Sequence, residues 1–289
     1  MNKKYEKLKK YKMYEIYREI RFRVKDFLLC FINKFEPCNA QLQAIEIETI
    51  NRCNGICPFC PVNVHEQQRP YAKMSTELFE KIILDLSAKE YKGQICLFSN
   101  NEPFLDDRII EFHRFARSKL PNAFFDLFTN GSLLNMDKFL DIINFLDRLV
   151  IDNYNDNIEV NPNLKEIYDY LEKHRELQSK VLFSFRLQNE VLGSRGGQAP
   201  NKKDAKCARS PCSLPFSQMV VRPTGEVSLC CNDALGKYTL GNLNNNTIWE
   251  IWEGEQYTKI RAEMSENGRK NLLLCKNCDS LKSYNFVRM

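Results

Sequence analysis

The sequence lacks any hydrophobic run long enough to cross a membrane. Near its start the longest apolar run, Phe27 to Ile32, has six residues, whereas a spanning helix needs roughly 18–20. Residues 1–26 alternate charged and aromatic residues and have no apolar core of the kind that marks a secretory signal. These absences predict a cytoplasmic protein.

Glycine, proline and histidine are also scarce. Eleven Gly and eleven Pro among 289 residues exclude a collagen-like or low-complexity chain. The composition, 43% hydrophobic and 27% charged, is instead that of a globular protein with a sizeable core. Twelve Cys stand against three His, and clustered Cys in a cytoplasmic protein indicate metal binding rather than disulfides.

Positive charge is concentrated at the N-terminus. The net charge of the chain is +5, and residues 1–38 contain eleven Lys or Arg against five Asp or Glu, so this segment carries +6 and the remainder −1. The nearly neutral body argues against nucleic acid as the main partner.

Residues 1–40 are predicted to form a basic amphipathic helix. Apolar residues recur there mostly at steps of three and four, as on one face of a helix: Met13, Ile16, Tyr17, Ile20, Val24, Phe27, Leu28, Phe31, Ile32 and Phe35. The pattern favours a helix that docks on the body. The alternative is peripheral contact of residues 1–36 with a membrane surface.

Strand-like and helix-like segments alternate between residues 41 and 200. Strands are predicted over residues 43–49, 94–99, 123–129, 148–152 and 181–188. The intervening helices are predicted over residues 76–86, 106–118, 136–145 and 162–178, the first with Ser75 as its N-cap. This order predicts an α/β fold with a parallel sheet and ligand-binding loops at the carboxyl ends of its strands. Residues 189–205 have the composition of a linker, and a second, cysteine-rich module follows over residues 201–289.

Three cysteines follow the first predicted strand in a C-x3-C-x2-C pattern: Cys53, Cys57 and Cys60. Three thiolates on one loop can hold three irons of a four-iron cluster and leave the fourth iron open. A structural zinc site normally takes four ligands, and the nearby candidate for a fourth is His65. The pattern favours an iron–sulfur cluster, with a three-ligand zinc site as the alternative.

The run Cys53-Asn-Gly-Ile-Cys57-Pro-Phe59-Cys60 resembles the motif of the radical S-adenosylmethionine (SAM) superfamily. The resemblance implies a partial (β/α)6 TIM-like barrel over residues 41–200, with a [4Fe–4S] cluster whose open iron binds SAM. It also implies reductive cleavage of SAM to a 5′-deoxyadenosyl radical, with a reductant such as flavodoxin or ferredoxin. Phe59, the aromatic residue before the third Cys, is expected at the cofactor.

Further matches to this superfamily end the next three predicted strands. Asn100-Asn101-Glu102-Pro103 stands where the superfamily often has Gly-Gly-Glu-Pro, which contacts the methionine ammonium, so Asn101 and Glu102 are expected cofactor contacts. Asn130 and Asp152 are expected there too, Asp152 where relatives place a polar contact to ribose or carboxylate. Asn130-Gly131 can alternatively be a simple turn.

A second set of cysteines lies in the C-terminal module. Cys212 and Cys230 are followed by Cys275 and Cys278 in a C-x2-C pair. Four thiolates can enclose either a zinc ion or a [4Fe–4S] cluster, and spacing alone does not separate the two.

The same module, residues 201–289, resembles the SPASM/twitch auxiliary-cluster domains of many radical SAM enzymes. The matching features are a C-x12-G-x4-C element that ends at Cys230, the run Leu240-Gly241-Asn242-Leu243 and a helix around Ile248–Trp252. A full SPASM domain has further Cys after Cys278, and residues 279–289 contain none. The pattern is therefore similar to the single-cluster type of 2-deoxy-scyllo-inosamine dehydrogenase, which implies a second [4Fe–4S] cluster.

Other residues have weaker signals. Arg195, in the loop after the fifth predicted strand, is predicted to contact substrate, with a flexible hinge as the alternative role. Cys207 is a candidate extra ligand or hydrogen-atom donor, and Cys231 should point away from the site of its neighbour Cys230. Cys96 and His113 are interpreted as structural residues.

Together these patterns predict a radical SAM oxidoreductase with a small-molecule or peptide substrate. The radical would take hydrogen from a C–H bond of a sugar or cyclitol alcohol, and the auxiliary cluster would accept an electron as the ketone forms. The enzymatic alternatives are a peptide-modifying maturase and a radical epimerase, which would use a Cys thiol to return hydrogen. The non-enzymatic alternative is a metal-binding scaffold.

Overall fold

The computed structural model describes residues 40–64, 69–202 and 206–281 and, nearer the N-terminus, Ile20, Val24, Phe27 and Leu28. These four apolar side chains are between 48% and 64% exposed. The predicted docking of the N-terminal helix otherwise lies outside the described residues, as does His65. In the described ranges, no helix is both long enough and apolar enough to span a membrane.

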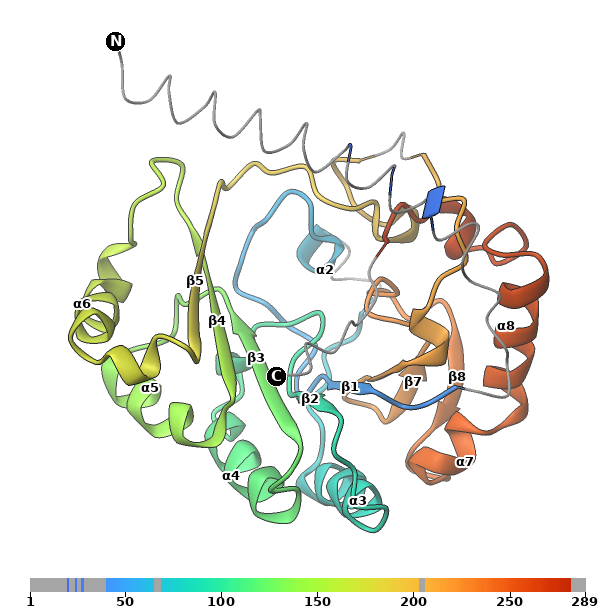
Figure 1. Ribbon diagram of the computed structural model, residues 1–289, viewed down its shortest axis with the longest axis horizontal. Coiled ribbons are helices and arrows are strands. Elements are labelled where there is room, and N and C mark those ends of the chain that lie inside the picture. The colour runs from blue at the N-terminus through green and yellow to red at the C-terminus, as the bar shows by residue number, and fades with distance from the viewer. Residues whose placement is uncertain are drawn as a thin grey trace.

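One curved sheet of eight strands organises the described chain (Figure 1), in the order β5-β4-β3-β2-β1-β6-β7-β8. Neighbours from β5 through β6 pair in parallel, and β7 pairs antiparallel with both β6 and β8. The strands are β1 (Ala44–Ile47), β2 (Gln94–Cys96), β3 (Phe124–Thr129), β4 (Arg148–Tyr154), β5 (Val181–Arg186), β6 (Gln218–Val221), β7 (Glu226–Ser228) and β8 (Thr239–Asn242).

Helices line the outer side of this sheet, which curves around the interior of the molecule (Figure 1). Their bounds are α3 (Thr76–Ser87), α4 (Ile109–Lys119), α5 (Met136–Ile142), α6 (Lys165–Lys173), α7 (Ile248–Trp252) and α8 (Glu255–Glu266). The short helix α2 (Pro61–Val64) lies inside the curve instead (Figure 1). The predicted N-cap of α3 is confirmed, because the Ser75 hydroxyl accepts a hydrogen bond from the Leu78 N–H at 3.1 Å.

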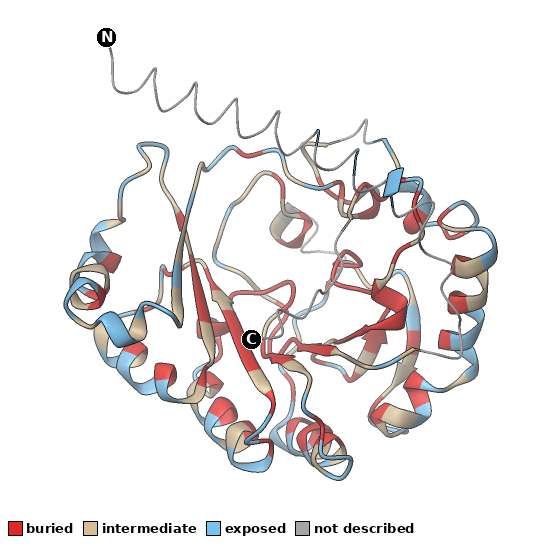
Figure 2. Cartoon of the chain, in the orientation of Figure 1, coloured by how far each residue is buried: buried red, intermediate tan, exposed pale blue. Residues whose placement is uncertain are grey.

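The hydrophobic core lies between the sheet and the outer helices. Successive side chains of a strand point to opposite faces, and Ile45, Ile95 and Phe125 are fully buried in one cluster with Phe79 and Ile82 of α3. Figure 2 shows the consequence, with buried residues on the helix faces that meet the sheet and exposed residues on the faces turned outward. Polar side chains that alternate with these on the same strands, such as Glu46, lie on the inner face of the sheet.

The predicted partial barrel is confirmed, and its sixth parallel strand has an origin that the sequence did not indicate. The five predicted strands are β1 to β5, whereas β6 belongs to the C-terminal module and pairs with β1, with Ala44 opposite Gln218 and Ile47 opposite Val221. All four residues of β6 are buried. Their backbone N–H and C=O groups therefore need hydrogen-bond partners, which the neighbouring strands supply. The C-terminal module thereby continues the sheet of the barrel.

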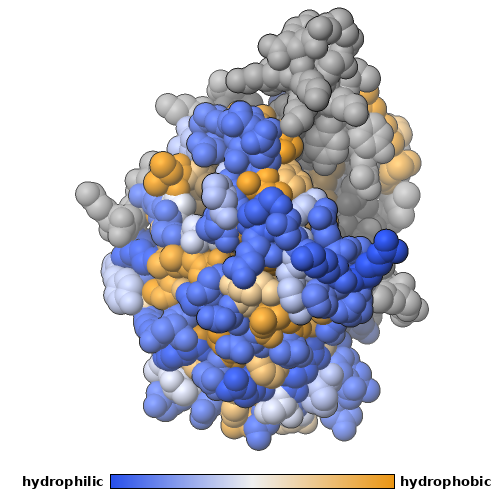
Figure 3. All heavy atoms as spheres, turned by 90° about the vertical axis from the view of Figure 1, so that its left-hand side faces the viewer, coloured by the Kyte–Doolittle hydropathy of each residue, from blue (hydrophilic) through white to orange (hydrophobic). Residues whose placement is uncertain are grey.

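The barrel stays open at its other edge. Strand β5 ends the sheet, and its residues Leu182 and Phe185 are 56% and 38% exposed. Figure 3 views this side of the molecule, where hydrophobic groups lie among hydrophilic ones. The sheet therefore curves without closing at β5.

Candidate functional site

Cys53, Cys57 and Cys60 lie on one loop between β1 and α2, and all three are half-buried. Burial raises the pKa of the Cys53 thiol to about 12, and the charges of Cys60 and Cys57 add to this rise. A Cβ atom on Gly55 would lie 3.4 Å from the Sγ atom of Cys53 and 3.7 Å from that of Cys57. The thiols of Cys53 and Cys57 therefore both lie beside the small Gly55.

Glu102 joins the ends of two strands beside this loop. Its side chain is 1% exposed, and its carboxylate accepts hydrogen bonds from the Thr129 hydroxyl at 2.7 Å and the Asn130 N–H at 2.8 Å. Burial raises the pKa of Glu102, and the charge of Asp152 adds to the rise. The predicted residues at the ends of β2, β3 and β4 thus face one region.

Asn130 lies in a turn beside the first cysteine loop. Its Nδ2 atom donates to the Oδ1 atom of Asn54 at 2.9 Å and lies 3.8 Å from the Sγ atom of Cys53. Gly131 has a φ of +72°, in the left-handed region that favours glycine in a turn. The turn therefore aims Asn130 at the first cysteine loop.

Asn101 presents an unpartnered donor in the same region. Its Oδ1 atom accepts the Ser99 N–H at 3.1 Å, and its Nδ2 atom is buried without a hydrogen-bond partner among the described residues. A buried donor of this kind is costly unless a ligand or water satisfies it. The residue therefore fits a site that binds a polar cofactor.

Two residues that the sequence analysis missed, Tyr154 and Arg186, lie at the ends of β4 and β5. Burial raises the pKa of Cys57, and a hydrogen bond from Tyr154 opposes this rise. The Tyr154 ring lies 6.0 Å from that of Phe59, which is buried. The Arg186 guanidinium pairs with Asp152 at 3.6 Å. Their position at the carboxyl end of a parallel strand was the available signal.

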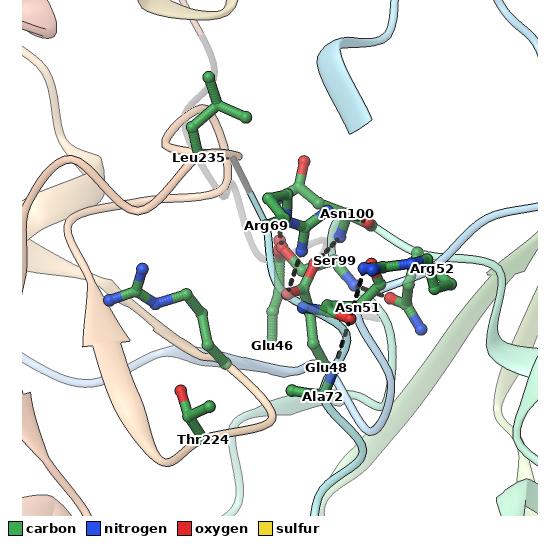
Figure 4. Close-up of polar contacts among 12 residues, drawn as sticks. Glu46, Glu48, Asn51, Arg52, Arg69, Ala72, Ser99, Asn100, Thr224 and Leu235 are labelled. Carbon is green, nitrogen blue, oxygen red and sulfur yellow. Dashed lines mark hydrogen bonds and ion pairs between the residues drawn. The ribbon is translucent and has the colours of Figure 1, made fainter. Parts of the chain in front are cut away.

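A buried ion pair supports the end of β2 (Figure 4). Arg69 pairs with Glu48 at 2.8 Å and donates to the carbonyl of Asn100 at 3.0 Å, while Glu48 accepts the Asn100 N–H at 2.7 Å. A cavity of about 240 Å³ adjoins this pair and is also lined by Arg222 and Glu226. Groups of both charge signs and several hydrogen-bonding side chains therefore surround it.

Cys212, Cys230, Cys275 and Cys278 form the second set and are all buried. Cys230 follows β7, and the N–H of Cys278 donates to the carbonyl of Cys275 at 3.0 Å. Burial raises the pKa of Cys230 well above its ordinary value, and the charges of Cys231, Cys212, Cys275 and Cys278 add to the rise. The fold thus brings together all four predicted thiols of the C-terminal module.

Sets of thiolates such as these can bind a zinc ion or an iron–sulfur cluster. Within residues 40–64, 69–202 and 206–281, no three His, Cys, Asp or Glu side chains are close enough to hold a single metal ion. Zinc holds its thiolates about 2.3 Å from one centre, whereas the irons of a cluster stand apart and each takes its own thiolate. Soft thiolate donors of this number fit an iron–sulfur cluster.

The two other cysteines of the module lie beside the second set. The Sγ atom of Cys207 is half-buried and donates to the Cys275 carbonyl at 3.4 Å. Cys231 is buried, and its carbonyl accepts hydrogen bonds from the side chains of Asn100 at 3.2 Å and Arg195 at 3.1 Å.

Arg195 therefore connects the two sites. Besides the Cys231 carbonyl it binds the Oδ1 atom of Asn100 at 2.7 Å, and its φ of +51° is unusual for a residue with a side chain. The hydroxyl of the preceding Ser194 donates to the carbonyl of Asn277 at 2.7 Å. The loop that carries the second site thereby sets the position of Arg195.

Cys96 and His113 are structural, as expected. Both are buried, and the Nδ1 atom of His113 lies 2.8 Å from the Ile109 carbonyl in the preceding turn of α4. Burial lowers the pKa of His113 to about 4, so the imidazole is neutral at neutral pH.

Two family models match the chain. Residues 47–182 match the radical SAM superfamily, and residues 212–279 match SPASM, an iron–sulfur cluster-binding domain. An S-adenosyl-L-methionine-dependent 2-deoxy-scyllo-inosamine dehydrogenase from Niallia circulans is 27% identical over 238 residues, which cover 82% of this chain and 92% of the relative.

Solved structures share the fold. BtrN in complex with AdoMet and 2-DOIA superposes with a TM-score of 0.72 at 24% identity, over 84% of this chain and 95% of that one. The enzyme anSMEcpe with bound AdoMet has a TM-score of 0.53 at 14% identity, over 82% and 86% of the two chains.

Proposed function

The chain belongs to the radical SAM superfamily, and we propose that it oxidises a secondary alcohol of a cyclitol or sugar-like small molecule. The observation that carries this proposal is the presence of two separate thiol sets, linked by Arg195 through Asn100 and Cys231. Two clusters suit a net two-electron oxidation, because one cluster can start the radical chemistry and the other can take the remaining electron. The dehydrogenase activity of the Niallia relative supports the same reaction class.

Each thiol set has a proposed ligand role. Cys53, Cys57 and Cys60 would hold the [4Fe–4S] cluster that binds SAM, and the four thiols of the C-terminal module would hold the auxiliary [4Fe–4S] cluster. When bound, the first cluster supplies the electron for reductive cleavage of SAM to a 5′-deoxyadenosyl radical, and the auxiliary cluster accepts one electron.

Residues at the strand ends would position SAM. The unpartnered Nδ2 atom of Asn101 is a donor for the carboxylate or a ribose hydroxyl of the cofactor, and Asp152 offers an acceptor that is only partly used by Arg186. Phe59 gives this region an apolar wall. Glu102 holds the ends of β2 and β3 together, and its carboxylate would offer an acceptor to the methionine ammonium.

The chain would also orient the substrate. Arg195 uses one nitrogen for Asn100 and Cys231, so its other N–H groups are the proposed donors to substrate hydroxyls. In the reaction the alcohol carbon loses a hydrogen atom, its hydroxyl loses a proton, and one electron leaves, so that a ketone remains. Burial of the second set keeps water away from the electron acceptor.

The test uses the anaerobically reconstituted protein with SAM, dithionite and a panel of aminocyclitols and sugar alcohols. The expected result is 5′-deoxyadenosine formed together with a ketone, and transfer of deuterium from the labelled carbinol carbon into 5′-deoxyadenosine. A panel that gives no coupled ketone, with hydrogen taken instead from a peptide, would move the assignment to a peptide-modifying maturase. A flavodoxin or ferredoxin is the proposed biological reductant, and it should replace dithionite.

Contact with a membrane surface is a second proposal, for residues 1–36. It is supported by the +6 charge of residues 1–38 and by the exposure of Ile20, Val24, Phe27 and Leu28. The full chain should sediment with anionic liposomes and release as salt rises, whereas a chain that begins at residue 37 should stay in solution. A truncated chain that aggregates or melts at lower temperature would instead support docking on the body.

A further inference from the structure

Arg269 is a buried cation, and none of the described carboxylates pairs with it. It follows α8, and its side chain is 4% exposed. In the described part of the chain it forms no ion pair, and the buried carboxylate of Asp279 pairs instead with Lys202 at 2.6 Å. Because a buried unpaired charge is costly, such a guanidinium is expected to face another source of negative charge.

Three backbone carbonyls hold the guanidinium in place. Its Nε atom donates to Ser210 at 2.8 Å, its Nη2 atom to Ser280 at 2.8 Å, and its Nη1 atom to Cys278 at 3.3 Å. Ser210 precedes Cys212 by two residues, and Ser280 follows Cys278 by two. The guanidinium therefore spans the first and last segments of the second thiol set, and its planar fork leaves little freedom to turn away.

Arg269 therefore lies beside the chain segments that carry Cys212 and Cys278. Arg261 is a second buried guanidinium in the same module. It is also 4% exposed and donates to the carbonyls of Pro215 and Trp252, and burial lowers its pKa.

We propose that Arg269 is the counter-charge of the auxiliary cluster and raises the reduction potential of that cluster. The proposal rests on the proposed function, in which this cluster accepts an electron during oxidation of the substrate. A reduced cluster carries one more negative charge than the oxidised cluster, so a fixed cation stabilises the reduced form more.

The first site has a different balance of charge. Arg186 lies near Cys57, but its guanidinium is shared with the carboxylates of Glu190 at 2.5 Å and Asp152 at 3.6 Å. The positive charge of Arg269 is therefore less neutralised by carboxylates than that of Arg186. This asymmetry favours the auxiliary cluster as the electron acceptor of the pair.

The test is a mediated redox titration of the anaerobically reconstituted full chain, followed by electron paramagnetic resonance. Addition of SAM identifies the signal of the first cluster, because SAM binds there. Arg269→Gln should lower the potential of the auxiliary cluster by an amount that changes its one-electron reduction equilibrium about tenfold, or about 59 mV. Arg261→Gln, which removes an equally buried guanidinium, should leave both potentials unchanged.

Arg269→Lys keeps the charge and cannot reproduce the three-carbonyl fork. If Arg269→Gln does not retain its iron, the lysine variant decides the question. A reduction equilibrium within about threefold of the wild type supports the counter-charge, and a change of about tenfold or more assigns Arg269 a purely structural role. An unchanged potential in a fully loaded Arg269→Gln protein overturns the proposal.

The titration needs no substrate, so it separates the two levels of inference. A potential that depends on Arg269 in a protein that oxidises no alcohol rejects the proposed function and keeps this inference. If the enzyme oxidises an alcohol but the potential of its auxiliary cluster does not depend on Arg269, the proposed function is kept and this inference is rejected.

Discussion

The two cysteine sites present the same donor atoms in opposite surroundings. The first set is half-buried on a loop whose Ile56 is 93% exposed, whereas each thiol of the second set is at most 9% exposed and packs in the hydrophobic core. A site that must admit SAM and leave one iron open has to remain accessible. A site that only exchanges electrons can be sealed, and its buried cation then acts through a medium of low dielectric constant.

The strongest test of this comparison removes the first set. Replacement of Cys53, Cys57 and Cys60 by Ala should abolish SAM cleavage and lower the iron content from about eight to about four per chain, because the second set is separate. Iron and sulfide analysis and an assay for 5′-deoxyadenosine measure the two effects. Cys96→Ala, which removes a buried thiol outside both sets, is the control and should keep all the iron. Continued SAM cleavage by the triple variant would falsify the assignment of the first site.

Removal of the second set should have a different effect. Replacement of Cys275 and Cys278 by Ala should eliminate the auxiliary cluster, while the first site still cleaves SAM without forming a coupled ketone. Because metal binding at a closed site is partly folding energy, residues 207–281 should also lose structure. Circular dichroism recorded beside the assay detects this loss. One stoichiometric zinc in the natively purified protein would contradict the assignment of an auxiliary cluster and make the second set a structural zinc site.

The third prediction concerns how the stability of the barrel depends on pH through the buried His113. Burial lowers the pKa of His113 from 6.5 to about 4, so the unfolded chain binds this proton at a higher pH than the folded chain does. The neutral imidazole contributes stability above about pH 6.5, and up to ~3 kcal/mol of it should be lost as the pH falls to about 4. Urea unfolding at several pH values measures this slope, and His113→Leu should reduce it. An equal slope in the variant would assign the acid sensitivity to other groups.

The smallest expected effect concerns the connection between the sites. Gly196 has a φ of +63°, and a Cβ atom there would lie 2.4 Å from the Leu274 side chain, next to Cys275. Gly196→Ala should therefore destabilise the protein by about 1–2 kcal/mol and displace Arg195. Gly268→Ala is the matched control, because Gly268 has a φ of +64° and no atom within 4 Å of the added Cβ. Equal melting temperatures for the two variants would show that strain alone, and no clash, sets the cost.

Much of the barrel could be predicted because its signals are local. Hydrophobic alternation and turn residues placed β1 to β5, and the Ser75 cap placed the start of α3. Strands β6 to β8 and helix α8 were not predicted, because the strands are three or four residues long and find their partners far away in sequence. Gln218 of β6, for example, binds Glu46 of β1 across 172 residues. No local pattern reports such a pairing.

The same limit applies at the sites. The thiols were predictable from their spacing, whereas Tyr154 and Arg186 come from separate strands that meet only in the folded sheet. Arg269 was not predicted either, since one arginine among forty-two Lys and Arg residues has no distinguishing mark in the sequence. Its importance depends on burial and on the absence of a carboxylate beside it in the described chain.

The sequence by itself determined the donor atoms and their grouping, because ligands on one short loop or in a C-x2-C pair are brought together by local geometry. Tertiary structure decided everything that depends on surroundings. It joined β6 to β1, buried one thiol set and left the other half-open. It also placed Arg269 against the segments that carry the buried thiols, and Arg195 against both Asn100 and the Cys231 carbonyl. The physical reason is that burial, charge compensation and reduction potential are properties of neighbours, and the chain acquires most of its neighbours only by folding.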